Sequence, residues 1–257
     1  MPGLHDPKFN QHLYCIHRSP LVVYGVHSLP YDYRDDLVML SAGPEEGSAI
    51  YRRVIGNEKI KKILGKDEKL LLINPVEPIN LPMPLCRHLE IAFPPVVLRP
   101  GAERKIYLTF PVEIGVFLGW EGNYDILDLF SFVPVKFSLY GTPNTGLITR
   151  WYYSRTHDAP PRVDRHREGV LELTLKNRSA DYIEVSRTIF ERSEMQIFYG
   201  DLVAMTAVME IYSHVVALTR FPPRSAFNGL TGALSLFTAQ KIPVVQHKGF
   251  LMEHGVV

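Results

Sequence analysis

The sequence lacks the features that identify many protein classes at a glance. Its 257 residues include two cysteines, Cys15 and Cys86, so a disulfide framework is excluded and a reducing cytoplasm is the expected compartment. No basic stretch followed by an apolar one opens the chain, so no secretory leader is expected. The longest weakly charged stretch, residues 202–219, contains Glu210 and His214, and we therefore expect no membrane span.

A strong net charge and the common catalytic motifs are missing as well. The formal net charge is +1, which gives no long-range field that would attract nucleic acids or other polyanions. The chain contains no GxxxxGK(S/T), GxSxG, CxxC or HExxH motif. The phosphate loop, the hydrolase nucleophile and the zinc-protease centre that these motifs specify are therefore not expected, and neither is a bound cofactor or metal.

Proline, in contrast, is abundant. The chain has 20 prolines, which break helices and favour turns, edge strands and irregular crossings. Four of them lie within residues 74–84, NPVEPINLPMP, so this stretch is predicted to be an extended crossing between strands. Around it, short apolar segments alternate with polar turns, as in AIYRRVI, IKKIL and KLLLINPV, which predicts a β meander. A helix over residues 57–72 is the alternative, but Gly56 and Gly65 occupy positions suited to hairpin turns.

The second half of the chain shows the clearest strand pattern. Residues 170–177, VLELTLKN, alternate well, which predicts a half-buried strand with Leu171, Leu173 and Leu175 on one face and Glu172, Thr174 and Lys176 on the other. Residues 202–219 are interpreted as hairpin strands, with a buried helix as the alternative because alanine, methionine and leucine suit both.

These patterns predict a mainly β fold of two β-sandwich-like halves packed together, with few or no long helices. Residues 155–169, RTHDAPPRVDRHREG, are polar, charged and interrupted by Pro160 and Pro161, which is typical of a linker. We therefore predict an N-terminal β-rich domain over residues 1–154, a linker over 155–169 and a C-terminal β-sandwich-like domain over 170–257.

Three segments resemble a known family: NPVEPINLP at residues 74–82, LTFPVEIGVF at 108–117, and FSLYGTPNTGLITRWYYS ending at Ser154. They are similar to the archaeal domain-of-unknown-function 432 family, and the resemblance extends from about residue 50 to about residue 220. That family brings no assigned catalytic residues, cofactor or substrate. The resemblance is used only to rank a membrane protein, such as a channel, above other partners.

Two acidic residues lie inside these segments, each after Pro-Val. Glu77 and Glu113 are candidates for paired carboxylates, which do general acid and base work or hold a cation when they lie close together. The alternative is that each carboxylate accepts backbone N–H bonds in a proline-containing bend, since buried carboxylates need such partners.

Two metal-site hypotheses have weaker support. Cys15-Ile-His17 and Cys86-Arg-His88 repeat a C-x-H pattern whose sulfur and imidazole groups suit zinc, but the usual ligand spacing is absent. The cluster of His157, Asp158, Asp164 and His166 resembles a set of phosphohydrolase ligands, yet the adjacent prolines favour a solvated loop.

Basic and aromatic residues gather around the predicted linker. Five arginines lie there with three consecutive aromatic residues: Arg150, Arg155, Arg162, Arg165, Arg167, Trp151, Tyr152 and Tyr153. Together they suggest stacking and phosphate contacts with a nucleotide or a single-stranded nucleic acid. The alternative is an ordinary strand on which Trp151 and Tyr153 face one side and Tyr152 faces the other.

The favoured hypothesis is a noncatalytic accessory protein that binds a protein partner near the proline-rich crossing and the Arg150–Tyr153 strand end. Two others stay open. One is an enzyme or small-ligand-binding protein with a pocket between the halves, where Glu77, Glu113 and Arg150 supply the polar groups. The other is single-stranded nucleic-acid binding through residues 150–167.

Overall fold

The computed structural model describes residues 23–45, 47–65, 70–82, 85–120, 123–236 and 250–252. Strands form nearly all of the regular structure in these ranges, and a single 3-10 turn lies at Arg192–Glu194 (η1). The prediction of a mainly β protein is therefore confirmed. Within the same ranges, no helix has the length and apolar character that crossing a membrane requires.

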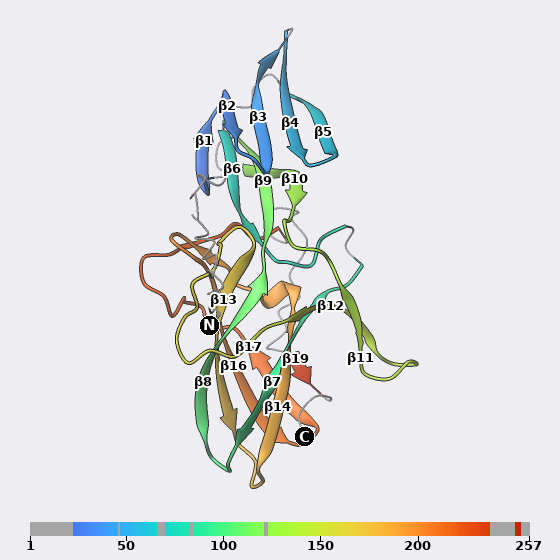
Figure 1. Cartoon of the computed structure of the whole chain (residues 1–257), viewed down its shortest axis with the longest axis vertical. Helices are drawn as coiled ribbons and strands as arrows, with labels where there is room; N and C mark the ends of the chain where they lie inside the picture. The colour runs from blue at the N-terminus through green and yellow to red at the C-terminus, as the bar shows by residue number, and fades with distance from the viewer. Residues whose placement is uncertain are drawn as a thin grey trace, which may run out of the picture.

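One pair of sheets forms a sandwich in the lower half of Figure 1. The first sheet has the order β11-β12-β7-β14, with strands Phe137–Tyr140 (β11), Leu147–Tyr153 (β12), His88–Leu98 (β7) and Ile183–Glu191 (β14). The second has the order β18-β15-β16-β13-β8, and β17 and β19 extend it from β16. Its strands are Thr231–Gly232 (β18), Phe198–Tyr199 (β15), Val203–Ser213 (β16), Glu168–Asn177 (β13), Glu103–Pro111 (β8), Val216–Arg220 (β17) and Phe250–Met252 (β19).

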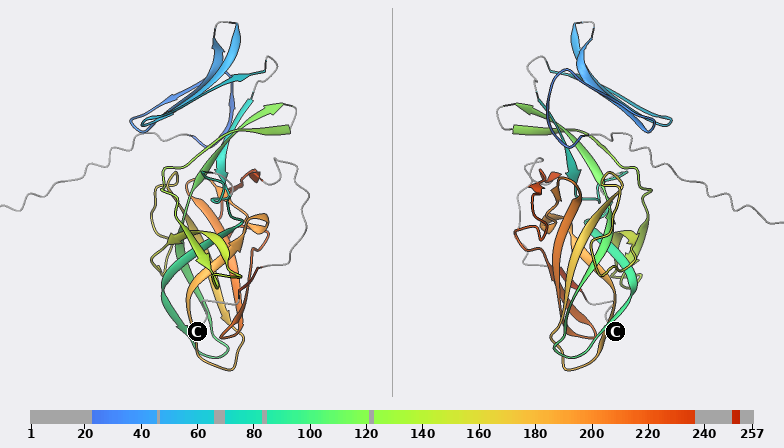
Figure 2. Two further views of the ribbon diagram at one scale, coloured as in Figure 1. Left: turned by 90° about the vertical axis from the view of Figure 1, so that its right-hand side faces the viewer. Right: turned by 60° about the vertical axis from the view of Figure 1, so that its left-hand side comes forward.

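Two smaller sheets occupy the upper end of the molecule (Figures 1 and 2). The first has the order β1-β6-β9-β10, with strands Gly25–Ser28 (β1), Leu70–Val76 (β6), Glu113–Trp120 (β9) and Asn123–Phe130 (β10). The other has the order β2-β3-β4-β5, with strands Tyr31–Arg34 (β2), Val38–Glu45 (β3), Ser48–Ile55 (β4) and Glu58–Leu64 (β5). Of the meander predicted over residues 49–76, the β4–β5 hairpin is present, and Gly56 takes the positive φ of 52° that its turn needs. The third strand of the prediction, β6, pairs with β1 and β9 in the other sheet instead of with β5.

The strand interpretation of residues 202–219 is confirmed, and the helix alternative is wrong. β16 and β17 pair antiparallel there as a hairpin. In β16, Met205, Ala207, Met209 and Ile211 are all fully buried, which is the period of two that one face of a strand produces.

Strand pairing crosses the predicted linker. β8 pairs with β13 along its whole length, and β7 pairs with β14, so segments from both sides of residues 155–169 share the same sheets. The linker itself is held against β8, because His157 forms a β-bridge with Tyr107. Polar and proline-rich composition marks where a chain leaves a sheet, but it carries no information about which strands pair afterwards.

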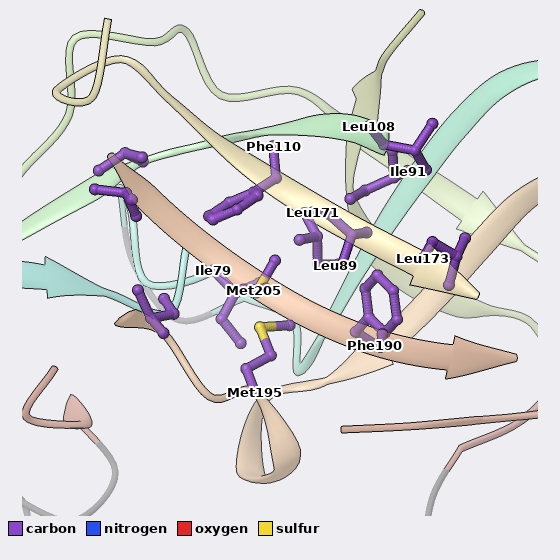
Figure 3. Packing of buried hydrophobic residues seen from close by; sticks show 14 of the residues in the cluster. Ile79, Leu89, Ile91, Leu108, Phe110, Leu171, Leu173, Phe190, Met195 and Met205 are labelled. Carbon is purple, nitrogen blue, oxygen red and sulfur yellow. The ribbon is translucent and has the colours of Figure 1, made fainter. Parts of the chain in front are cut away.

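The sandwich core lies between its two sheets (Figure 3). Leu89 and Ile91 from β7 face side chains that β8, β13 and β16 supply, including Leu108, Leu171 and Met205. Leu171, Leu173 and Leu175 are fully buried on one face, as predicted for residues 170–177. The strand is more than half-buried, because Val170 and Glu172 on its other face are buried as well. The burial of apolar surface in such a core is the main favourable contribution to the free energy of folding.

Gly169 marks the tightest contact in this core. A Cβ atom added there would fall inside the contact distance of the Phe110 ring, whose side chain is fully buried and has no room to move. We expect Gly169→Ala to lower the free energy of unfolding by about 1–3 kcal/mol through overpacking. Urea denaturation would measure the change.

Gly232→Ala is the matched control, because a Cβ at Gly232 meets nothing within 4 Å. The overpacking explanation is wrong if both substitutions change the urea midpoint equally. A partial recovery of stability in the double variant Gly169→Ala, Phe110→Leu would support it, since the two sites then show an interaction energy.

Candidate functional site

The sandwich and the upper pair of sheets meet where one extended segment runs from one to the other. Only Val112 separates β8 in the sandwich from β9 in the upper sheet, and Glu113 is the first residue of β9. Glu113 pairs with Val76, the last residue of β6. Residues 74–76 of the predicted crossing therefore belong to that strand, and the crossing begins only at Glu77. The strand register therefore places both predicted carboxylates at this junction, although they lie 36 positions apart in the sequence.

The crossing turns back on itself so that its backbone binds Glu113. The N–H of Asn80 donates to Glu113 Oε2 at 3.0 Å, and the N–H of Leu81 donates to Oε1 at 3.3 Å. The Asn80 side-chain amide adds a third bond to Oε2 at 3.1 Å. Asn80 also donates to the carbonyl oxygen of Glu77, which closes the turn.

Arg150 completes this cluster from the other side. Its Nη1 donates to Glu113 Oε1, and both side chains are buried, with 1% and 0% of their surfaces exposed. Arg150 Nη2 has no hydrogen-bond partner within the described ranges, so Glu113 provides the compensation for the buried guanidinium charge. Burial raises the pKa of Glu113, whereas the positive charge of Arg150 and the three N–H donors from the crossing oppose that shift.

Arg150 and the crossing therefore satisfy the Glu113 carboxylate. A carboxylate that accepts four donors in a closed environment has little capacity left for a substrate or a cation. The alternative stated for the acidic pair, in which backbone N–H groups of a proline-containing bend bind each carboxylate, describes the observed contacts of Glu113. Through these contacts the cluster holds the crossing against β12, and it connects the sandwich to the upper pair of sheets.

Glu77 lies on the other side of the crossing and borders a pocket. The pocket has a volume of about 240 Å³, and Glu77 is the ionisable residue among those that line it. The Ser235 hydroxyl donates to Glu77 Oε1, and the N–H of Leu236 donates to Oε2 at 3.1 Å. Burial raises the pKa of Glu77, while these two donors and the charge of Arg192 act in the opposite direction.

Comparison with known proteins assigns the family. The model of the DUF432 family, described as a protein of unknown function, matches residues 23–253. The chain belongs to the DUF432 family. The resemblance inferred from the three segments is thereby confirmed. No curated protein and no solved structure matches the chain.

The metal hypotheses gain no geometric support in this DUF432 protein. Cys15 and His17 lie outside the described residues. Cys86 is buried, and burial raises the pKa of its thiol and lowers the pKa of the His88 imidazole. Across the part of the chain that the structure describes, no group of three or more His, Cys, Asp or Glu side chains is arranged to hold a metal ion.

The four predicted phosphohydrolase ligands face different surroundings. His157 bridges to the backbone of Tyr107, and Asp158 lies 3.5 Å from Arg104. Asp164 accepts the backbone N–H of His166, whose buried ring stacks on Tyr24 with 4.8 Å between ring centroids. Of these contacts, the His157 bridge is made by the backbone, and the Asp158 side chain is 92% exposed.

The arginines proposed for nucleic-acid binding are largely engaged elsewhere in the DUF432 protein. Arg150 is buried against Glu113, Arg165 donates to the carbonyl oxygen of Gly200, and Arg167 lies 3.6 Å from Asp164. A guanidinium committed to an internal carboxylate or carbonyl is less available for phosphate. The stacking and phosphate hypothesis therefore loses Arg150 and Arg165, whereas Arg167 and Asp164 form an exposed pair at the surface.

The neighbouring aromatic residues follow the ordinary strand pattern. Trp151 and Tyr153 alternate with Tyr152 along β12. The Tyr152 hydroxyl donates to Glu168. Trp151 is half-buried with Lys136 Nζ 5.8 Å from its ring centroid, and Tyr153 is 51% exposed. These two side chains stay available at the end of the strand.

The hairpin formed by β11 and β12 is a feature that the sequence analysis did not single out. β11 ends its sheet, so one of its edges has no neighbouring strand among the described residues. Phe137 and Leu139 on β11 are 40% and 46% exposed, and Ile148 on β12 is 54% exposed. The register pairs Leu139 with Ile148 and Phe137 with Arg150, so these apolar side chains share one face. The absence of charge from residues 137–149 is the sequence signal that would have identified it.

Proposed function

We propose that this DUF432 protein is a noncatalytic binding protein that docks a protein partner along the free edge of β11. The observation that carries the proposal is a short edge strand with exposed apolar side chains and no charged residue of its own. Proteins usually protect such edges with lysines, prolines or bulges, because unpaired backbone groups otherwise recruit another chain. β5 shows that protection, with Lys59, Lys61 and Lys62 on its seven residues, whereas residues 137–149 carry no charge.

The chemistry of the edge defines the partner. An extended segment added beside β11 would satisfy the free backbone groups, and apolar side chains on that segment would cover Phe137, Leu139 and Ile148. Charged side chains would lose hydration there without gaining an ion pair, so the segment is expected to be uncharged. Trp151 and Tyr153, at the far end of β12, lie on the opposite face of the strand from Ile148.

The compartment and the kind of partner follow from other observations. We place the protein in the cytoplasm because two cysteines in 257 residues suit a reducing compartment. The family resemblance favours a membrane protein, such as a channel, as the protein that supplies the segment.

The test compares tagged full-length protein, wild type and Leu139→Lys, recovered from its native cells after amine-reactive cross-linking. Lys136 is exposed and directly precedes β11, so a partner on this edge is expected to cross-link to it. We expect the amount of stoichiometric partner recovered with Leu139→Lys to be at least tenfold lower than with wild type. Because Leu139 is half exposed, the substitution should change the free energy of unfolding of the protein by only about 0.5 kcal/mol.

Ile63→Lys is the matched control, because Ile63 is 76% exposed on the protected strand β5. Recovery of the same proteins in the same amounts from wild type and Leu139→Lys would refute the proposal. So would sedimentation velocity showing a dimer that Leu139→Lys abolishes, since a second copy would then occupy the edge.

A further inference from the structure

We infer that the segment that docks on β11 is an antiparallel strand with the side-chain pattern apolar, small polar, apolar, and that it bonds to the backbone of Phe137 and Leu139. This inference rests on the proposed function and adds the direction, the register and the side chains of the partner segment. β11 projects from one side of the molecule (Figure 1), and among the described residues it is the last strand of its sheet.

The backbone groups that face the free edge of β11 belong to Phe137 and Leu139. The N–H of Trp151 donates to the carbonyl oxygen of Lys136 at 2.9 Å, so these two residues form a hydrogen-bonded pair at the start of the β11–β12 ladder. Bonded and non-bonded pairs alternate along an antiparallel ladder, which makes Ser138 the next residue bonded to β12. The N–H and C=O groups of Phe137 and Leu139 therefore point away from β12, as two donors and two acceptors.

The short length of this edge favours an antiparallel partner. In an antiparallel ladder, the two residues of a bonded pair exchange both bonds, so three partner residues satisfy all four outward groups of Phe137 and Leu139. In a parallel ladder, the residue opposite Ser138 bonds to one group of each neighbour, and the other two groups need a longer partner segment. β11 has four residues, and Gly141 follows it with a φ of 103°, so the shorter pairing fits.

The two faces of β11 define the side chains of the partner. Residues opposite one another share a face, so the partner residues across from Phe137 and Leu139 would cover side chains that are 40% and 46% exposed. Ile148, which pairs with Leu139 and is 54% exposed, widens this apolar face. The partner residue between them lies opposite Ser138, which is half-buried on the other face. Cα atoms in such a non-bonded pair approach to about 4.5 Å, which favours a small polar side chain there.

The test is an NMR titration of the isotope-labelled full-length protein with the capped peptide acetyl-Thr-Val-Ser-Val-Thr-amide. Its two valines are expected to lie opposite Phe137 and Leu139, and the amide signals of β11 and β12 are expected to shift until the edge is saturated. An N-methyl group on either valine removes a donor that faces β11, so we expect it to weaken binding at least tenfold. An N-methyl group on the central serine, which faces away, is the matched control and should change the affinity less than twofold.

Proline substitutions test the same orientation from the side of the protein. Leu139→Pro removes an N–H that faces the free edge, so we expect this variant to bind the peptide at least tenfold more weakly while its urea midpoint stays close to that of wild type. Ser138→Pro removes an N–H that bonds to β12 and is expected to lower the urea midpoint. Equal losses of stability in the two variants would contradict the orientation assigned to β11.

Three results of the titration would overturn the inference. Weaker binding on methylation of the serine, but not of the valines, would show a parallel partner. Equal affinity of all the peptides would show that side chains alone make the contact. No shift at β11 with the unmethylated peptide would show that the edge does not accept this class of segment. The proposed function is decided separately, by recovery of a partner from native cells.

Discussion

Arg150→Ala is expected to lower the free energy of unfolding by about 3–5 kcal/mol, because it leaves the buried Glu113 carboxylate without its positive partner. Three N–H donors from the crossing remain, yet neutral donors do not replace the charge. Urea denaturation at pH 7 measures the loss, and an unchanged m-value would show that stability alone has changed.

Arg155→Ala is the control for this prediction, because Arg155 is exposed just beyond the same strand and its loss should cost no more than about 0.5 kcal/mol. A double-mutant cycle with Glu113→Gln separates the pair from its surroundings. We expect the double variant Glu113→Gln, Arg150→Met to be more stable than the single variant Arg150→Ala, because the double variant leaves no uncompensated charge buried. Equal effects of Arg150→Ala and Arg155→Ala would show that the buried pair contributes nothing.

Asp128→Ala is expected to cost a similar amount, about 3–5 kcal/mol, through a second buried network. Asp128 Oδ2 accepts bonds from Arg53 Nε at 2.6 Å and from the Tyr51 hydroxyl at 2.7 Å. Arg53 and Tyr51 lie on β4 and Asp128 on β10, so this network joins the two upper sheets. Removal of the Asp128 carboxylate leaves the buried Arg53 paired with Glu58, whose side chain is 61% exposed.

Hydrogen exchange locates this effect. Because the network belongs to the upper sheets, we expect the amides of β3 and β4 to exchange faster in Asp128→Ala, while those of β13 and β16 keep their protection. Asp125→Ala, at an exposed position of the same strand, is the control. Faster exchange spread evenly over all four strands would contradict a role confined to the upper pair of sheets.

The two buried networks have different sequence signals. Glu113 was identified because it repeats the Pro-Val-Glu context of Glu77, and Arg150 because it begins a run with three aromatic residues. Asp128 and Arg53 had no such signal, since charged residues on a strand are ordinarily expected on its solvated face. A second sheet covers that face here, and only the packing of the sheets reveals it.

The sequence by itself determined the local character of this chain. Its prolines, glycine turns and period-two alternation predicted strands, including β13 and β16, because these signals act over a few neighbouring residues. Only the tertiary structure decided which strands pair across residues 155–169 and that Glu113 meets Arg150. It also decided that Glu77 borders a pocket while β11 is left with a free edge. Pairing between distant segments depends on how whole faces fit together, and no short stretch of sequence contains that information.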